Sequence, residues 1–226
     1  MEKNQYKLCI EVLRRLNEIG VLANIIVIGS WCIPFYKEYF ATTKYSPSIK
    51  TRDIDLLVPK PHKFHRNVDI PDLLKDLGFI IGFKGSEGYI MLEHPKLIVE
   101  FLVPEKGKGE DKPYPLPQLG LNAQALRFLN FLTQSTINII VNDIPITIPH
   151  LANFALHKLI IFKRRKNQEK TEKDKEASIK ILKALVDKNE STSIKKAFES
   201  APKSWQKKII KGLEEVKEIE ILDILE

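Results

Sequence analysis

Short β-type runs alternate with helical patterns over the first 148 residues of this chain, and from His150 onward the pattern is helical almost throughout. Wholly apolar runs such as Ile25–Ile28 are typical of buried strands, whereas the C-terminal stretch repeats its apolar residues at helical intervals. This succession predicts an α/β (α+β) fold in which a mixed sheet is flanked by helices. We expect two domains, an α/β core over residues 1–148 and a helical C-terminal lobe over residues 149–226.

Two hairpins are expected within the core. The runs at 88–94 and 96–104 form one pair, and Asn142-Asp143 separates the strands of the other. The charged, proline-rich segment 105–120 is expected to be a mobile surface loop.

Composition sets broad limits on function. The chain has 226 residues, of which 43% are hydrophobic and 29% charged, as in ordinary globular proteins. No apolar run approaches the roughly 20 residues of a membrane helix, and the charged N-terminus does not match a signal peptide. Cys9 and Cys32 lie in apolar helical patterns, which indicates reduced residues of a cytoplasmic protein. The net charge of +7 permits a polyanionic partner without requiring one.

The segment Thr51–Pro59 reads as a strand that begins with two carboxylates. Side chains alternate along a strand, so Asp53 and Asp55 share one face while Ile54 and Leu56 point into the core. Two adjacent carboxylates repel each other unless a cation lies between them. Mg²⁺ is commonly held by one or two carboxylates and nucleotide phosphates. A D-x-D pattern also occurs by chance on solvated strands.

Two further features bear on the same chemistry. Gly29-Ser30 ends an apolar strand and enters a helix, which suits phosphate binding. Taken singly, the pair is better explained by Ser30 as an N-cap with Gly29 serving the turn, whereas together with the acidic strand it favours a phosphate site. Glu100 is a lone acid in the apolar run 96–104. A desolvated charge requires a partner, so Glu100 either pairs with a cation such as Lys96 or an arginine, or joins the metal site.

This order of features resembles the nucleotidyltransferase fold of the polymerase-beta superfamily. The run Thr51–Leu57 is especially similar to bacterial nucleotidyltransferase-fold proteins related to abortive-infection (AbiEii-like) toxins, and the likeness continues in the helical segment after Pro149. One departure is the distance between Ser30 and Asp53, since the 22 intervening residues exceed what is usual in the family. This indicates an inserted loop near the site.

The resemblance implies roles for individual residues. Asp53, Asp55 and Glu100 would be catalytic and would bind Mg²⁺ or Mn²⁺, and the nucleotide phosphates would be bound by a second group: Gly29, Ser30, Lys158, Arg164 and Arg165.

Two residues of the helical stretch have competing interpretations. On pattern alone, Lys158 is a lysine whose stem covers apolar surface while its ammonium reaches water. Asp174 fits a capping box with Thr171 as N-cap, and alternatively it orients Lys158 or an arginine.

The function that follows is nucleotidyl transfer. We expect a metal-dependent, ATP-binding or other NTP-binding transferase that moves a nucleoside monophosphate to a hydroxyl of RNA, a protein or a small molecule by a two-metal mechanism. The resemblance also suggests a place in a toxin–antitoxin pair. The alternatives are a catalytically silent nucleotide- or RNA-binding module with the same fold and, ranked last, a glycosyltransferase. No membrane partner is expected, and the sequence does not indicate the oligomeric state.

Overall fold

The structure is a computed structural model that describes residues 3–40, 51–61, 64, 66–105, 112–164 and 167–226. The chain divides into two compact units, here called the sheet unit and the helical unit. The sheet unit comprises Met1–Phe35 and Ser48–Ile148, and the helical unit comprises Tyr36–Pro47 and Pro149–Glu226. Helix α2 (Cys32–Tyr39) carries the chain from the first unit into the second.

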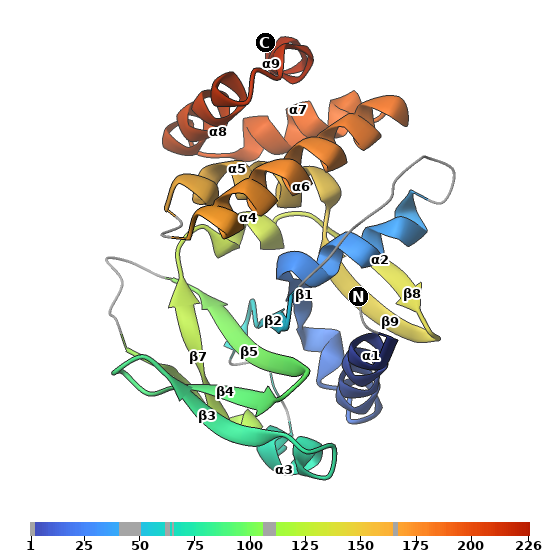
Figure 1. Cartoon of the computed structure of the whole chain (residues 1–226), viewed down its shortest axis with the longest axis vertical. Coiled ribbons are helices and arrows are strands. Elements are labelled where there is room, and N and C mark those ends of the chain that lie inside the picture. The colour runs from blue at the N-terminus through green and yellow to red at the C-terminus, as the bar shows by residue number, and fades with distance from the viewer. Residues whose placement is uncertain (1–2, 41–50, 62–63, 65, 106–111, 165–166) are drawn as a thin grey trace. The chain divides into compact units, whose positions relative to one another are not determined.

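The sheet unit is built on a mixed seven-stranded sheet (Figure 1). Its main path runs β1-β2-β5-β4-β3, with β7 also paired to β5 and β6 paired to β7. Among the strand pairs of this sheet that lie in the described residues, only β2–β5 and β5–β7 are parallel. The strands are β1 (Ile26–Ile28), β2 (Asp53–Leu57), β3 (Ile80–Lys84), β4 (Tyr89–His94), β5 (Leu97–Pro104), β6 (Tyr114–Leu116) and β7 (Leu121–Leu126). The predicted mixed sheet flanked by helices is confirmed.

One face of this sheet is closed by core packing. Ile54, Leu56, Val99 and Phe101 alternate with the acids of β2 and β5 and are almost fully buried. Burial of such side chains contributes about 1.5–3 kcal/mol each, so these positions fix the register and, with it, the face on which the acids lie.

Further helices and a hairpin belong to the described part of the sheet unit. The helices are α1 (Lys3–Glu18), α3 (Ile70–Lys75) and α4 (Leu129–Thr133). The hairpin is β8 (Thr136–Val141) and β9 (Ile144–Pro149). Its two turn residues, Asn142 and Asp143, have φ of 49° and 64°, as a tight two-residue hairpin turn requires. Both predicted hairpins are confirmed.

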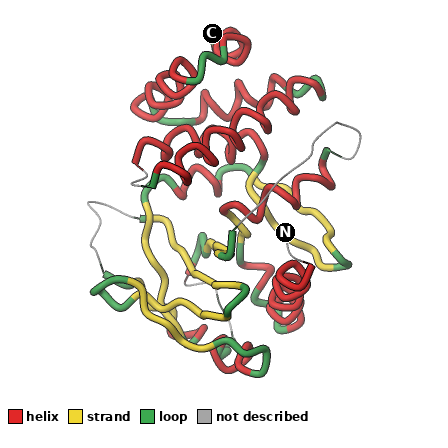
Figure 2. The backbone as a smooth tube through the Cα atoms, in the orientation of Figure 1, coloured by secondary structure: helices red, strands yellow, loops and turns green. Residues whose placement is uncertain are grey.

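Beyond Pro149 the described residues form helices and short connections only (Figure 2). The helices are α5 (Leu151–Ile161), α6 (Gln168–Asp187), α7 (Ser191–Ser200), α8 (Lys203–Glu215) and α9 (Ile219–Leu225). Tyr36 of α2 joins this unit, because its hydroxyl donates to the Pro149 carbonyl oxygen at 2.8 Å and its ring packs edge-on against Phe154. No helix in the described ranges has the length and apolar character needed to cross a membrane.

Two local predictions differ from the structure. The segment 105–120 is not wholly irregular, since Tyr114–Leu116 forms β6 and pairs with β7; residues 106–111 lie outside the described residues. Strand β3 was not predicted. Its residues Ile80, Ile81 and Phe83 are all largely exposed, so the strand lacks the alternation of apolar and polar side chains that marks a half-buried strand.

Candidate active site

Strands β2 and β5 carry three acids on one face, here called the carboxylate face. The two strands are parallel, and Asp53 lies opposite Ile98 while Asp55 lies opposite Glu100. Because paired residues point to the same side of a sheet, as do residues two apart, Asp53, Asp55 and Glu100 project together. All three are half-buried. The structure therefore brings together the acids that the sequence singled out.

An apolar cluster borders these acids on the same face. Leu57 and Leu102, each two residues beyond an acid, pack with Leu129 and Leu132 of α4. Ile28, which pairs with Asp55, belongs to the same cluster. The acids consequently lie at the edge of a core, where charges are screened less than on an open surface.

Gly29 lies directly against Asp55. Its φ is +70°, and a Cβ added there would lie 2.0 Å from Asp55 Oδ2. Both the left-handed backbone and the close approach therefore require glycine. Ser30 follows in a short 3₁₀ turn, Gly29–Trp31, that leads straight into α2. The Gly-Ser turn and the acidic strand are thus neighbours in space.

Glu100 has a cationic partner, and it is Lys84 rather than Lys96. The Lys84 Nζ lies 2.8 Å from one Glu100 carboxylate oxygen and 3.1 Å from the other. Arg52, which precedes the acidic pair, donates from Nη2 to the His94 carbonyl oxygen at 3.1 Å. Burial, followed by the positive charges of Lys96 and Arg52, lowers the pKa of His94.

The carboxylate face offers the kind of ligand that a hard divalent cation binds. Three carboxylates on adjacent strand positions supply the oxygen ligands that Mg²⁺ prefers. Within the ranges that the structure describes, however, no three His, Cys, Asp or Glu side chains converge closely enough to hold a metal ion. Since Glu100 is engaged by Lys84, metal binding by all three acids requires that carboxylate to turn away from the ammonium.

Lys158 lies inside the helical unit. Its side chain is 5% exposed, and its Nζ lies 2.6 Å from Asp174 Oδ1 and 5.3 Å from the centre of the Phe154 ring. The ammonium therefore does not reach water. The interpretation in which the Lys158 stem covers apolar surface while its ammonium reaches water is wrong. The alternative role of Asp174, orienting Lys158, is confirmed.

The capping box at Thr171 is also wrong. Helix α6 begins at Gln168, before Thr171, and its N-cap is Asn167, whose side chain accepts from the Lys170 backbone N–H at 3.0 Å.

Arg164 is exposed in the 3₁₀ turn Phe162–Arg164 that follows α5. Arg165 lies outside the described residues.

A sequence-family model described as a nucleotidyltransferase matches residues 7–203, well over half of the chain. The chain belongs to this nucleotidyltransferase family. The match spans the carboxylate face and most of the helical unit. A search of functionally curated proteins found no match.

Three solved structures are similar to this family member at low identity. A nucleotidyltransferase-like antigenic protein from Paracoccidioides brasiliensis has 10% identity and a TM-score of 0.52, covering 98% of this chain and 91% of that one. A crystal structure of ANT(2″)-Ia with adenylyl-2″-tobramycin has 12% identity and a TM-score of 0.49, covering 81% and 90%. A solution structure of ANT(2″)-Ia, described as an antibiotic-resistance factor, has 12% identity and a TM-score of 0.47, covering 85% and 95%.

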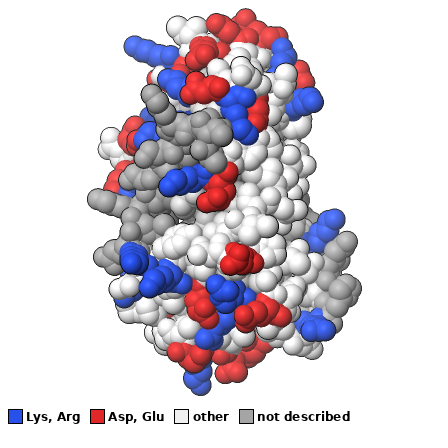
Figure 3. Space-filling view, turned by 90° about the vertical axis from the view of Figure 1, so that its right-hand side faces the viewer, with Lys and Arg blue, Asp and Glu red and all other residues white. Residues whose placement is uncertain are grey.

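The basic side chains of this nucleotidyltransferase are largely interspersed with acidic ones. Figure 3 shows one face on which both signs occur side by side. In the helical unit, Lys173 and Lys180 each pair with a glutamate one turn away on α6, and Lys183 pairs with Glu218. These lysines of α6 are therefore neutralised by neighbouring acids.

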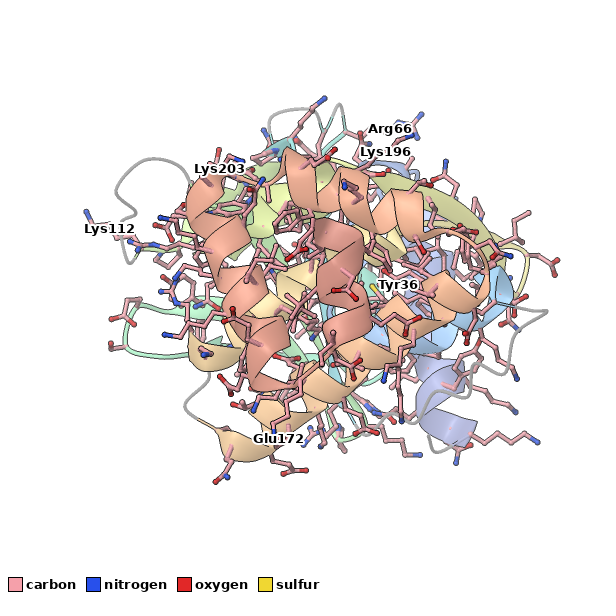
Figure 4. The ribbon with its side chains drawn as sticks, turned by 90° about the horizontal axis from the view of Figure 1, so that it is seen from above. Tyr36, Arg66, Lys112, Glu172, Lys196 and Lys203 are labelled. Atoms are coloured by element: carbon pink, nitrogen blue, oxygen red, sulfur yellow. The ribbon has the colours of Figure 1, made fainter. Side chains whose placement is uncertain are left out.

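One groove of the helical unit gathers several lysines. It has a volume of about 410 Å³ and is lined by Phe198, Lys203, Gln206, Lys207, Ile210, Lys211 and Glu214. Figure 4 labels Lys196 and Lys203 on the outside of this unit, whereas the buried Tyr36 lies among its helices.

Sequence reasoning missed two members of the carboxylate face. Glu93 of β4 pairs with Ile98 and shares its face, and a Cβ at Gly82 would lie 2.1 Å from the Glu93 Oε1 atom. Lys84, two residues beyond Gly82 on β3, reaches the same face. Lys84 could not be placed beside Glu100 from the sequence, because β3 lacks strand alternation and the contact depends on the strand order β5-β4-β3.

Proposed function

We propose that this protein transfers a nucleoside monophosphate from an NTP to a hydroxyl group of an acceptor. The observation that supports the proposal most directly is the common face of Asp53, Asp55 and Glu100 on β2 and β5, next to the Gly29-Ser30 turn. The family match supports the same class of reaction.

In the proposed reaction, the acceptor hydroxyl oxygen attacks the α-phosphorus, the bond to the bridging oxygen breaks, and pyrophosphate leaves. Glu100 would take the hydroxyl proton once it has separated from Lys84. Asp53 and Asp55, with Glu100, would hold two Mg²⁺ or Mn²⁺ ions, which when bound would supply positive charge for the triphosphate and the reacting oxygens. Most of the catalysis would be positioning and neutralisation of charge.

Phosphate binding would fall to the Gly29-Ser30 turn, to Lys158 of α5 and to the arginines that follow this helix. The backbone N–H groups where β1 enters α2 are suited to anionic oxygens. Arg164, which is exposed, is a suitable bidentate phosphate ligand. Lys158 would first have to leave Asp174, and Arg165 remains a candidate from the sequence alone.

The acceptor class extends to RNA, proteins and small molecules. A relation to AbiEii-like toxins, and a place in a toxin–antitoxin pair, belong to this proposal as well. The alternative is a module that binds a nucleotide or RNA without turnover. That alternative is favoured by one observation, the engagement of both Glu100 oxygens by Lys84.

Label transfer tests the proposal. Protein, Mg²⁺ or Mn²⁺ and each α-labelled NTP are incubated with total RNA, a protein extract or a small hydroxyl compound such as tobramycin. We expect a labelled product with the unchanged protein and with Asp143→Asn, an exposed acid in the β8–β9 turn. Asp53→Asn and Asp55→Asn should each lower transfer at least a hundredfold, within the range for lost transition-state electrostatics of about 10²–10³. Binding of nucleotide without any labelled product would favour the silent module.

A further inference from the structure

The ion pair between Lys84 and Glu100 joins two strands that are not adjacent in the sheet. Lys84 ends β3, Glu100 lies in β5, and β4 runs between them. Gly82 pairs with Met91, and Met91 pairs with Glu100, so these three positions share one face. Lys84 is two residues from Gly82 and therefore points to the same face.

The lysine must span two inter-strand distances to make this contact. Neighbouring strands lie about 4.7–4.9 Å apart, and β3 is two strands from β5. The contact is nonetheless close, with the ammonium within 3.1 Å of both carboxylate oxygens. Glu100 is the less accessible partner, since its side chain is 16% exposed and that of Lys84 is 48% exposed.

A carboxylate in this position cannot serve two cations equally well. A divalent ion bound by Glu100 would lie within a few ångströms of the ammonium, and like charges at that distance repel each other at the edge of an apolar cluster.

We propose that Lys84 is a resident counter-ion of Glu100 that competes with a divalent cation for this carboxylate. The inference rests on the proposed function, because it assigns Glu100 to a metal site. Lys84 is then a positioning residue: it neutralises the acid while the site lacks metal, and it must be displaced before Glu100 can act. The exposed stem of Lys84 leaves its ammonium free to turn into solvent when that happens.

The test measures the affinity of the protein for Mn²⁺ alone. The electron paramagnetic resonance signal of free Mn²⁺ monitors the binding. Lys84→Met removes the charge and keeps an apolar stem. We expect this variant to bind Mn²⁺ roughly threefold to tenfold more tightly than the unchanged protein, a modest gain because a half-exposed ion pair is weak. Lys84→Gln should give the same gain. Lys75→Met, an exposed lysine at the end of α3, is the matched control and should leave the affinity unchanged.

A double-mutant cycle identifies the carboxylate involved. In a Glu100→Gln background the effect of Lys84→Met should disappear, because the competition acts through Glu100. An equal gain in that background would overturn the proposal, since it would reflect the net charge of the face only. Unchanged affinity in Lys84→Met and Lys84→Gln, or no Mn²⁺ binding by any of these proteins, would overturn it as well.

The proposed function and this inference can fail separately. If label transfer depends on Asp53 but substitution of Lys84 leaves the Mn²⁺ affinity unchanged, the inference is wrong and the proposed function stands. If the Lys84 variants bind Mn²⁺ more tightly but no label is transferred, the competition is supported and the proposed transferase function is wrong.

Discussion

At the scale of single residues, the contact between Gly29 and Asp55 links the two halves of the candidate site. Gly29→Ala would place a methyl group where Asp55 Oδ2 lies, in a backbone with φ of +70°. We expect a loss of about 1–2 kcal/mol from the left-handed backbone alone, together with displacement of the Asp55 carboxylate. Urea unfolding and label transfer measure the two effects.

Gly20→Ala is the matched control for that substitution. Gly20 has nearly the same φ, +74°, but a Cβ added there would meet nothing within 4 Å beyond its chain neighbours. The control should lose similar stability and keep its transfer activity. Equal activity in both alanine variants would show that the Gly29 contact does not position Asp55.

The same residues show how far sequence reasoning reaches. Asp53 and Asp55 could be placed on one face because strand alternation is strict, and Glu100 stood out because it interrupts an apolar run. The partner of Glu100 could not be found, because Lys84 reaches it across a strand that carries neither residue. Partner choice in a sheet depends on strand order, which local patterns do not contain.

At the scale of elements, the start of α5 depends on a titratable cap. His150 is the N-cap, and its Nδ1 accepts from the Ala152 N–H at 3.2 Å. Burial lowers the pKa of His150, and the negative charge of Glu190 opposes that shift only in part. The folded state therefore favours the neutral ring, which keeps the accepting lone pair and avoids a positive charge at a helix N-terminus.

The sign of the pH effect follows from that lowered pKa. The cap stabilises the protein above the ordinary histidine pKa of 6.5, and this contribution is lost as the pH falls through the lower pKa of the folded state. His150→Asn keeps a capping acceptor that does not titrate. We expect the unchanged protein to lose more stability than the variant between pH 7.5 and pH 5 in urea unfolding. An identical loss in both would exclude His150 as the source.

Helix starts also show where local signals compete. Thr171 and Asn167 both precede helical sequence, and Thr171-Glu172-Lys173-Asp174 satisfies the capping pattern. The helix nevertheless begins after Asn167, whose side chain accepts from the Lys170 backbone N–H, and Asp174 pairs with Lys158. The sequence pattern does not contain the tertiary contact between Asp174 and Lys158.

At the scale of the whole molecule, the two units are assembled from interleaved stretches of chain. The sequence places a boundary near residue 148, and the described structure also assigns Tyr36 to the helical unit. That assignment follows from contacts with Pro149 and Phe154, which are more than a hundred residues away in sequence. Composition and periodicity do not reveal which residues distant in the sequence pack together, so they could not assign Tyr36 to its unit.

Ligand linkage tests how much of this assembly takes part in nucleotide binding. A ligand that binds only the folded state stabilises it by about 2.7 kcal/mol at a hundred times its Kd. We expect a non-hydrolysable NTP analogue with Mg²⁺ to raise the Tm of the unchanged protein. Asp53→Asn should remove most of that increase, since it weakens metal binding in the sheet unit.

Arg164→Ala extends the test to the helical unit. If Arg164 binds the phosphates, as proposed, this variant should lose a substantial part of the ligand-induced increase in Tm. Lys163→Ala is the matched control, because Lys163 is also an exposed cation of the 3₁₀ turn after α5. A full increase in both variants would confine nucleotide binding to the sheet unit, whereas losses of equal size would point to general positive charge rather than to a specific contact by Arg164.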